Sequence, residues 1–415
     1  MKIGIIGMGA AGMMAASQIL ESDFAGELLL FEKNSKIGNK VLISGGGRCN
    51  VTTGIHDLGE VLKKYPRGAK FLRYAFHEFG PESVYNWFED HGVKLKTESD
   101  LRVFPASDDG HDVVGVFENI FLNNQNCSLL LNSNVIEVIK VDEGFEVNCK
   151  DGSTYVLDKL ILTTGGQAFR HTGSTGDGYS FAEKLGHSIT KLGPSLNSFI
   201  LKEDWVKELA GVSHKHVVFK ASLEGKRIAF EGPCIWTHKG KSGPAIFAMS
   251  SLLAFAEFSK DSPFDLFIDL YPQMDQESLK NEILKFKDIN YKKLFKNAFT
   301  GIIPKRMVEV FFNTLGISLD VLCSEIKNKE IFRLIETIKN CKVSIIGRGK
   351  GDEFVTAGGV RTKEIDSNTM ESRICPNLFF AGELVDIDGF TGGFNLQASW
   401  ATGFLAGNNA KKSCN

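Results

Sequence analysis

The sequence predicts an α/β protein whose main domain is built on a parallel sheet and interrupted by an insert. The chain opens with an apolar run, a glycine-rich turn and a small-residue helix over 2–20, and a second apolar run over 28–31 follows. Apolar runs within 159–166 and 377–383 also lead into glycine-containing turns. Such alternation of buried strands with helices is typical of doubly wound sheets.

Length and composition exclude several classes of protein. The chain has 415 residues, 48 lysines and arginines against 50 aspartates and glutamates, and 43% hydrophobic residues. This composition is globular, neither disordered nor collagen-like, and the length predicts two or three domains. The net charge of −2 gives no global basic field for nucleic acid or a membrane surface, although it leaves room for a local basic patch.

The cysteines and the N-terminus favour a cytoplasmic protein. No two of the eight cysteines have CxxC spacing, which disfavours a thioredoxin-like dithiol and a cysteine-rich zinc site. The opening residues lack an apolar core followed by a cleavage site. The longest apolar stretch, 245–258, is shorter than the ~20 residues of a membrane span. We therefore expect neither a metal nor a membrane partner.

The first turn reads GMGAAG, and each of its glycines has a distinct expected role. Gly7 makes the tight turn, Gly9 lets a pyrophosphate approach the backbone, and Gly12 lets helix and strand pack closely. Glu32, about 20 residues further on, is placed to accept hydrogen bonds from ribose hydroxyls. The pattern predicts a dinucleotide site in a Rossmann-like domain, against the alternative of a glycine-rich turn without a ligand. A glutamate rather than an arginine here favours FAD or NAD over NADP.

Both ends of the chain contribute to this predicted site. Residues 389–396 read GFTGGFNL and lead into an Ala/Gly-rich segment to Gly407, which we expect to be a helix. A ligand contacted by both chain ends must be long. The isoalloxazine ring of FAD reaches well beyond the N-terminal glycine loop, so the pattern favours FAD over NAD.

With these motifs in view, the chain resembles the BaiN/RdsA-type bacterial NAD(P)/FAD-dependent flavoproteins, some of them aminoacetone oxidase-like, within the glutathione-reductase-like FAD superfamily. The resemblance rests on GMGAAG (7–12) with FEK (31–33), ISGGGRCNVT (43–52), THKGKSGPAI (237–246) and the segment 356–407. The first block is generic to dinucleotide folds, whereas GGGRCN and the C-terminal block are specific. Phe394 departs from the family pattern, which commonly has tyrosine there, so a phenolic hydroxyl is missing.

The resemblance implies which residues contact each part of FAD. The first glycine turn lines the pyrophosphate, and Glu32 with Lys33 binds the adenosine ribose. The backbone of Val135 meets adenine, and the loop after Lys40 runs along the flavin. The last helix aims its first N–H groups at the pyrimidine end, where they stabilise the negative charge of the reduced flavin. The implied set is Gly7, Gly9, Ala11, Gly12, Glu32, Lys33, Lys40, Ser44, Gly47, Arg48, Cys49, Asn50, Val135, Thr164, Gly165, Gly382, Glu383, Gly393, Phe394, Asn395 and Leu396.

The candidate catalytic residues are Arg48, Cys49 and Asn50, which would place a substrate and deliver a proton. The alternative is that GGGRCN only shapes a loop around the cofactor. A thiol beside an arginine is a candidate for a lowered pKa, but Cys49 has no partner cysteine nearby in sequence, which favours a packing role. His171, in a glycine-rich loop, is a weaker acid/base candidate, with a solvated loop histidine as the simpler interpretation.

The expected domain organisation follows from these patterns. The FAD domain is split by an insert that has a β-rich, barrel-like part and a helical part, the latter rich in Lys, Glu, Leu and Ile. The expected boundaries are 1–190 for the first part of the FAD domain, 191–355 for the insert, with β-rich segments at about 191–270 and 341–355 around a helical part at about 271–340, and 356–415 for the second part.

Three functions are consistent with these features. The favoured one is an FAD-dependent oxidoreductase that passes hydride from NAD(P)H through flavin N5 to an unsaturated small-molecule acceptor. With no second GxGxxG, NAD(P)H would bind transiently. The second is a flavin-dependent reductase of uracil in ribosomal RNA, for which 215–227 and 285–305 hold enough lysine and arginine for a local patch. The third is a non-enzymatic flavin-binding redox sensor.

Overall fold

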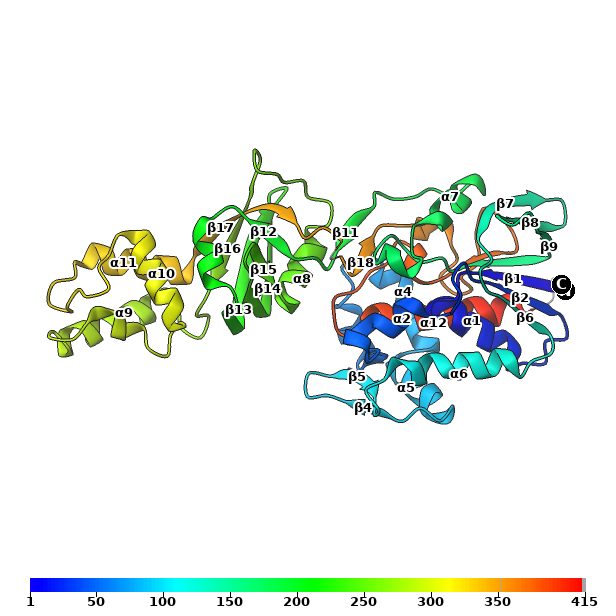
Figure 1. Ribbon diagram of the computed structural model, residues 1–415, viewed down its shortest axis with the longest axis horizontal. Helices are drawn as coiled ribbons and strands as arrows, with labels where there is room; N and C mark the ends of the chain where they lie inside the picture. Colours follow the sequence, from blue (N-terminus) through cyan, green and yellow to red (C-terminus); the bar gives the residue numbers. More distant parts are fainter. Residues whose placement is uncertain (352, 413–415) are drawn as a thin grey trace. The chain divides into compact units, whose positions relative to one another are not determined.

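The computed structural model describes residues 1–351 and 353–412, and it divides into two compact units (Figure 1). Unit 1 combines Met1–Ser195 with Phe354–Asn415, and unit 2 is Leu196–Glu353. Unit 1 runs past residue 190, where we expected its first part to end. The reason is that β11 (Gly193–Ser195) pairs in antiparallel fashion with β18 (Val355–Ala357).

A five-stranded parallel sheet forms the centre of unit 1 and confirms the predicted Rossmann-like fold. Its order is β19-β10-β1-β2-β6, and its strands are almost entirely apolar, as expected where both faces of a sheet are covered. Strand β19 comes from the C-terminal part of the chain, so both chain ends enter one sheet. The strands are β1 (Lys2–Ile6), β2 (Glu27–Phe31), β6 (Cys127–Leu130), β10 (Lys159–Leu162) and β19 (Leu378–Phe380).

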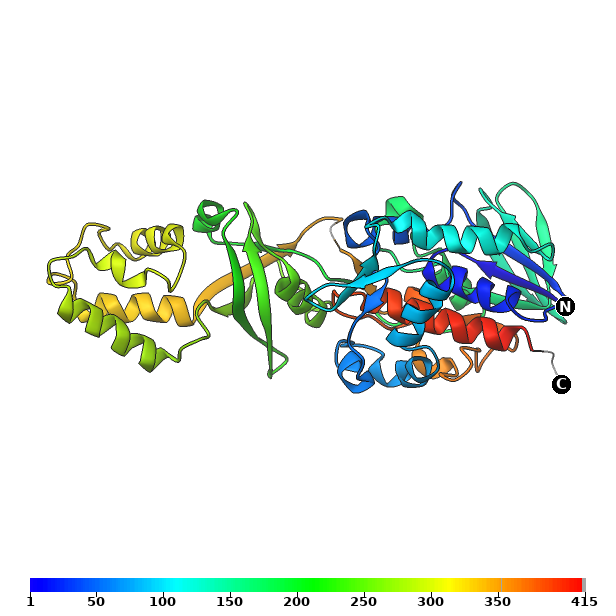
Figure 2. The same cartoon turned by 90° about the horizontal axis from the view of Figure 1, so that it is seen from below.

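Helices α1 (Ala10–Leu20) and α12 (Phe394–Ala410) pack against each other along their lengths and lie side by side in Figures 1 and 2. A Cβ added to Gly403 would lie 2.3 Å from the Ala11 carbonyl oxygen, and one added to Gly407 would lie 2.4 Å from that of Ala15. The two glycines are one helical turn apart, so they face α1 together. Their missing side chains allow backbone-to-backbone contact.

Smaller elements complete unit 1. A three-stranded sheet in the order β3-β5-β4 precedes an antiparallel meander, β7-β8-β9. The remaining elements are α2 (Asn39–Ile43), β3 (Thr52–Thr53), α3 (Leu58–Leu62), α4 (Ala69–Glu78), α5 (Pro81–Asp90), β4 (Leu95–Thr97), β5 (Arg102–Pro105), α6 (Gly110–Leu122), β7 (Val135–Val141), β8 (Gly144–Cys149), β9 (Thr154–Leu157) and α7 (Asp177–Lys184).

Unit 2 is a closed barrel, ordered β12-β15-β14-β13-β16-β17, with a helical part inserted between its last two strands. Pro244 opens α8, because proline suits the first turn of a helix. The elements are β12 (Phe199–Leu201), β13 (Ser213–Leu223), β14 (Lys226–Trp236), β15 (Gly240–Ser242), α8 (Pro244–Leu252), β16 (Phe264–Asp269), α9 (Gln276–Ile289), α10 (Lys305–Leu315), α11 (Asn328–Lys339) and β17 (Cys341–Arg348).

The barrel interior holds a lysine, Lys241 of β15, which is 0% exposed. Its Nζ lies 3.7 Å from the centroid of the Trp236 ring and 5.3 Å from that of Phe219, and it donates to Cys234 Sγ at 3.3 Å. Within the described residues Lys241 has no ion-pair partner. Burial lowers the pKa of the Lys241 amine, because the charged form loses its hydration.

Within the described residues, every helix is either too short or too polar to span a bilayer.

Substitution of Gly403 by alanine tests the contact between α1 and α12. The new Cβ would collide with backbone, which cannot rotate away as a side chain can, so Gly403→Ala should lower the stability of unit 1 by about 1–3 kcal/mol. The matched control is Gly115→Ala in α6, whose Cβ would meet nothing within 4 Å and should be neutral or stabilise by up to about 1 kcal/mol. Thermal unfolding of both variants measures the difference, and equal effects would contradict it.

Substitution of Lys241 by methionine tests the burial of its amine. Since the folded-state pKa is lowered, the unfolded chain takes up a proton more readily than the folded barrel below the ordinary lysine pKa of about 10.4. Lys241→Met should therefore raise the melting temperature at neutral pH, with a gain that shrinks as pH rises toward that value. The exposed Lys220 of β13, changed to methionine, serves as the control. A lower melting temperature for Lys241→Met at neutral pH would contradict the expectation.

Candidate functional site

The carboxyl ends of the parallel strands bring the glycine turns of both chain ends together. Gly7 comes directly after β1, Glu32 directly after β2 and Thr163 directly after β10. Gly382 comes after β19, separated from it by one residue. Ligands of open α/β sheets bind at this edge, beyond the ends of the strands. The sequence predicts that each turn follows its own strand. The order of the strands in the sheet then makes these turns neighbours.

The three glycines of the first turn meet different surroundings. Gly7 has φ +99° and a Cβ there would lie 2.8 Å from the Thr163 carbonyl oxygen, while a Cβ on Gly12 would lie 2.1 Å from the Gly7 carbonyl oxygen. Gly9 has φ −84°, and a Cβ on it would meet nothing within 4 Å. Packing therefore explains Gly7 and Gly12. Gly9 instead leaves open space at the start of α1, where helix N–H groups favour an anion.

Glu32 is 7% exposed and ties the second strand to the first turn. Its Oε2 accepts from the Met8 N–H at 3.0 Å, and its Oε1 accepts from the Asn34 N–H at 2.9 Å and from Asn34 Nδ2 at 2.6 Å. A carboxylate offers about four acceptor positions, and three donors occupy it here. At least one position is left for a ribose hydroxyl beside the open space at Gly9.

The C-terminal segment enters the site at Gly382 and Glu383. Gly382 has φ +73°, and a Cβ on it would lie 2.8 Å from the Ala11 side chain. Glu383 pairs with Lys40 Nζ at 2.6 Å and also accepts from the Thr356 N–H at 2.7 Å. The structure thus brings together two residues that lie 343 positions apart in the chain.

The start of α12 is held by residues from three segments. In the orientation of the Asn50 side-chain amide that satisfies both its oxygen and its nitrogen, Oδ1 accepts from the Gly393 N–H at 2.9 Å. The Tyr65 hydroxyl donates to the Phe394 carbonyl oxygen at 2.5 Å. Asn395 Oδ1 accepts from the Gly389 N–H at 2.8 Å. These bonds fix the backbone at the end of the site that we assigned to the flavin.

Arg48 is held in place by acidic and aromatic neighbours. Its Nη1 pairs with Glu98 at 2.7 Å and Asp108 at 3.2 Å, and its guanidinium lies 3.8 Å from the centroid of the Phe104 ring. The side chain is 30% exposed, and within the described residues Nε and Nη2 make no hydrogen bond. Arg48 is therefore a fixed cation with donors left for another group.

Cys49 is unsuited to thiol chemistry. Its side chain is 0% exposed, and burial raises the pKa of the thiol to about 12. Its backbone has φ +59°, and its N–H donates to the Ser44 carbonyl oxygen at 3.0 Å. With Asn50 used to hold Gly393, the geometry favours loop-shaping roles for Cys49 and Asn50 and leaves Arg48 as the member of the triplet that can reach a substrate.

The other residues implied by the resemblance are spread around this edge. Lys33 pairs with Asp177 at 2.7 Å, and Val135 begins β7. The buried Thr164 hydroxyl faces Gly178. Gly165 has φ +74°. Ser44 and Gly47 bound a short 3-10 turn whose inner glycines are left-handed, and the partly buried Leu396 packs against the core of unit 1.

Several residues that hold the site were not found from the sequence. They are Tyr65, the bidentate pair of Arg67 with the fully buried Asp388, and Gln397, which accepts from Thr52 Oγ1 at 2.6 Å. Each bonds to a residue hundreds of positions away, so no local spacing could have identified it.

Three of the histidines lie in different surroundings. His171 is exposed in its loop. His214 is largely buried, and burial lowers its pKa to about 4. His216 is exposed beside Glu231, at 3.4 Å. No cluster of three potential metal ligands occurs among the described residues.

The fold agrees with what comparisons with known proteins show. A model of the HI0933-like protein Rossmann domain matches residues 1–409. A 3-dehydro-bile acid delta(4,6)-reductase of Clostridium scindens is 31% identical over 410 residues, 98% of each chain. A ribosomal RNA dihydrouridine synthase of Escherichia coli is 31% identical over 402 residues, 96% of this chain and 95% of that protein.

Solved structures share the fold at lower identity. A flavocytochrome c3 fumarate reductase in an open conformation is 19% identical, with a TM-score of 0.50 over 99% of this chain and 78% of that one. With the family model spanning nearly all of the sequence and two relatives matched over almost their whole lengths, the chain belongs to the HI0933-like family and is an FAD-dependent oxidoreductase.

Proposed function

We propose that the protein takes hydride from NAD(P)H and delivers it, by way of FAD held at the carboxyl edge of the sheet, to an unsaturated small-molecule acceptor. The observation that carries this proposal is the open space at Gly9, which lies at the start of α1 beside the Glu32 carboxylate. The names of both relatives, a reductase and a dihydrouridine synthase, support a reductive reaction.

Different residues of unit 1 would contact different parts of FAD. The N-terminal turn with Ala11 would take the pyrophosphate, Glu32 the ribose, and the backbone from Gly393 to Leu396 the pyrimidine end of the flavin. Bound FAD supplies the two-electron chemistry, which the protein itself lacks. The N-terminus of the 17-residue helix α12 would stabilise negative charge at the flavin, and the bonds from Asn50 and Tyr65 keep that N-terminus fixed.

Arg48 is the residue we propose to orient the acceptor. Its pairing with Glu98 and Asp108 restricts its motion, and its unused donors suit a carbonyl or carboxylate conjugated to the bond that is reduced. We place the reaction in the cytoplasm, a reducing compartment in which the seven described cysteines, all free, would remain thiols.

Anaerobic mixing of the purified holoprotein with NADH or NADPH tests the proposal. Either nucleotide should bleach the flavin absorbance, and addition of a conjugated enone should restore it without oxygen. Failure of both nucleotides to reduce the flavin would count against NAD(P)H as the reductant. Reduction that no conjugated acceptor reverses would instead count against the acceptor class.

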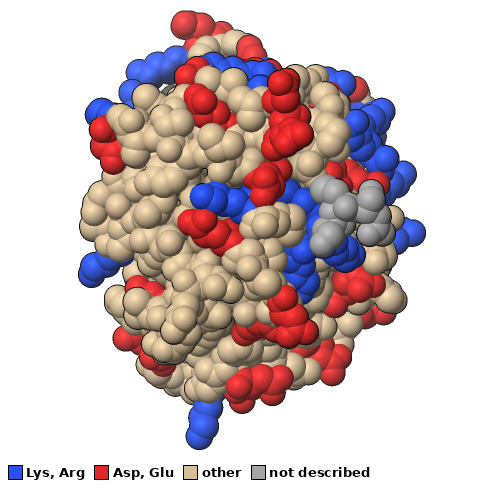
Figure 3. All heavy atoms as spheres, turned by 90° about the vertical axis from the view of Figure 1, so that its right-hand side faces the viewer, with Lys and Arg blue, Asp and Glu red and all other residues tan. Residues whose placement is uncertain are grey.

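A second candidate, reduction of uracil in ribosomal RNA, is favoured by the helical part of unit 2. Residues 285–296 contain five lysines and one acidic residue, Asp288. Tyr291 is 56% exposed, with Lys292 Nζ 5.6 Å from its ring centroid. Exposed aromatic rings flanked by cations suit stacking of single-stranded bases. By contrast, acidic and basic side chains are interspersed over the face of unit 1 in Figure 3.

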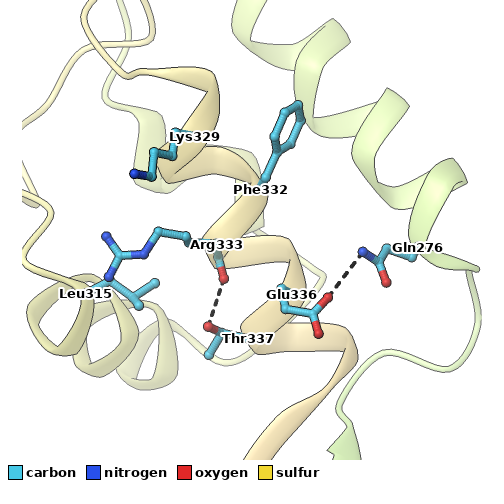
Figure 4. A pocket seen from close by; sticks show the side chains of 7 residues that line it. All are labelled: Gln276, Leu315, Lys329, Phe332, Arg333, Glu336 and Thr337. Atoms are coloured by element: carbon cyan, nitrogen blue, oxygen red, sulfur yellow. Dashed lines mark hydrogen bonds between the residues drawn. The ribbon is translucent and has the colours of Figure 1, made fainter.

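The helical part of unit 2 also holds a groove lined by residues of α9, α10 and α11. It has a volume of about 640 Å³ and is lined by Gln276, Leu315, Lys329, Phe332, Arg333, Glu336 and Thr337. Figure 4 shows the charged ends of Lys329 and Arg333 on one side of α11 and the ring of Phe332 on another. Neither cation forms an ion pair with the described residues, so both are available to phosphates.

The RNA candidate predicts that Lys292→Gln with Lys293→Gln weakens binding to ribosomal RNA fragments and flattens its salt dependence by about one unit of slope per lost phosphate contact. Flavin reduction by NAD(P)H should not change, because both lysines belong to unit 2 and to its exposed surface. Fluorescence anisotropy over a salt series measures the slope. Absence of RNA binding by the unaltered protein at low salt would remove this candidate.

The assignment of the pyrophosphate to Gly9 predicts a selective loss of cofactor. Gly9→Ala should fold normally, because its backbone angle suits any residue and its Cβ would contact no protein atom. Its methyl group would occupy the proposed pyrophosphate space and should weaken FAD binding about tenfold or more, about 1.4 kcal/mol. Flavin titration of the apoprotein measures this, with Gly115→Ala as control. Unchanged affinity would show that FAD does not approach Gly9.

A further inference from the structure

One pair of stacked aromatic rings in unit 1 takes no part in the contacts assigned to FAD. Phe169 belongs to the loop that follows β10, and Phe354 comes directly before β18. Their ring centroids are 5.6 Å apart and their planes differ by 13°. Phe169 is half-buried, whereas Phe354 is 37% exposed. The pair therefore presents an aromatic surface that a ligand can reach.

The two segments that carry these rings are fastened to Glu383. The Gln167 N–H donates to Thr356 Oγ1 at 2.7 Å, and the Thr356 N–H donates to Glu383 Oε1 at 2.7 Å. Gly166 packs so closely that a Cβ on it would lie 2.6 Å from Thr356 Oγ1 and 2.9 Å from Glu383 Oε1. Glu383 in turn pairs with Lys40. These contacts fix the ring pair beside residues that we assigned to the cofactor.

The backbone of Phe169 is strained. Its φ of +55° and ψ of +50° place it in the left-handed region, which is uncommon for a bulky side chain. Two hydrogen bonds to its carbonyl oxygen hold this conformation, one from the Thr172 N–H and one from Thr172 Oγ1, both at 2.8 Å. Such a conformation persists only where the surroundings enforce it, and residues of this kind gather at ligand sites.

Cations border the aromatic surface. Lys40 Nζ lies 5.8 Å from the centroid of the Phe169 ring. Arg170 is exposed, and its Nη2 donates to the neutral side chain of Gln167 at 3.0 Å. The exposed His171 ring meets that of Phe169 edge to face, with the centroids 5.9 Å apart. A flat aromatic face next to a guanidinium suits a ligand that combines an aromatic ring with phosphate groups.

We propose that Phe169 and Phe354 form the docking site of a nicotinamide nucleotide, with its flat ring stacked on Phe354 and its phosphates at Arg170. The inference rests on the proposed function, in which NAD(P)H must reach the cofactor at this edge of the sheet. The GxGxxG turn at 7–12 is already assigned to FAD. Stacking and a few cations provide the reversible binding that a transient reductant needs. An acceptor without phosphates would make no use of Arg170.

Rapid anaerobic mixing of the holoprotein with NADH or NADPH tests the docking site. The dependence of the flavin reduction rate on nucleotide concentration gives the dissociation constant of the nucleotide. Phe354→Leu keeps an apolar side chain but removes the flat face, so it should raise this constant roughly two- to tenfold. Phe354→Tyr retains the face and should keep the constant of the unaltered protein. Arg170→Gln should raise the constant and reduce its dependence on salt.

Phe255→Leu is the matched control, because Phe255 is 38% exposed, close to the value of Phe354, but belongs to unit 2. It should leave the dissociation constant unchanged. Flavin content and reduction by dithionite should be the same in every variant. An unchanged constant in Phe354→Leu, or an effect confined to the KM of the acceptor, would overturn the docking site and leave the proposed function intact.

Hydrogen–deuterium exchange of the unaltered holoprotein tests the site without relying on any variant. Saturating NAD⁺ or NADP⁺, which cannot reduce the flavin, should slow the exchange of backbone N–H groups in 165–172 and 354–357. Protection of other segments alone would overturn the docking site, even where NAD(P)H reduces the flavin. If the nucleotides neither reduce the flavin nor protect any segment, both the docking site and the reductant of the proposed function are wrong.

Discussion

The contact between the first and last helices is the constraint on which the rest of unit 1 depends. Gly403 and Gly407 let α12 approach the backbone of α1, and Gly382 approaches Ala11 in the same region. Because each contact is backbone against backbone or against a methyl group, it has little freedom to relax. The contact therefore sets where the N-terminus of α12 lies relative to the first glycine turn, and those two helix starts frame the site.

Within that frame, the residues of GGGRCN are held by contacts with their neighbours. Cys49 is buried as a neutral thiol, Asn50 holds the Gly393 N–H, and Arg48 is clamped by two acids over an aromatic ring. A segment with three polar side chains thus orders a loop and presents a single cation. Such fixed groups lose little entropy when a ligand binds, which is the physical basis of preorganisation.

Unit 2, by contrast, contains side chains that do not contribute to its stability. Lys241 has no counter-ion among the described residues, and burial in the barrel core lowers the pKa of its amine, so this lysine reduces stability at neutral pH. The helical part of the unit adds exposed aromatic rings and lysines that unit 2 does not need for its core. Packing of the unit alone does not require the buried lysine of the barrel or the exposed rings and lysines of the helical part.

The sequence by itself determined the local features: the apolar strands, the tight turn at Gly7, the close packing at Gly12 and the helix that follows the last glycine turn. These depend on apolar periodicity, backbone sterics and turn residues, which act over a few positions. Only the tertiary structure decided that Lys40 pairs with Glu383, that Asn50 holds Gly393, and that Lys241 is buried beside Cys234. Such contacts depend on which strands become neighbours, and burial then changes the protonation of a side chain whose identity alone suggests an exposed charge.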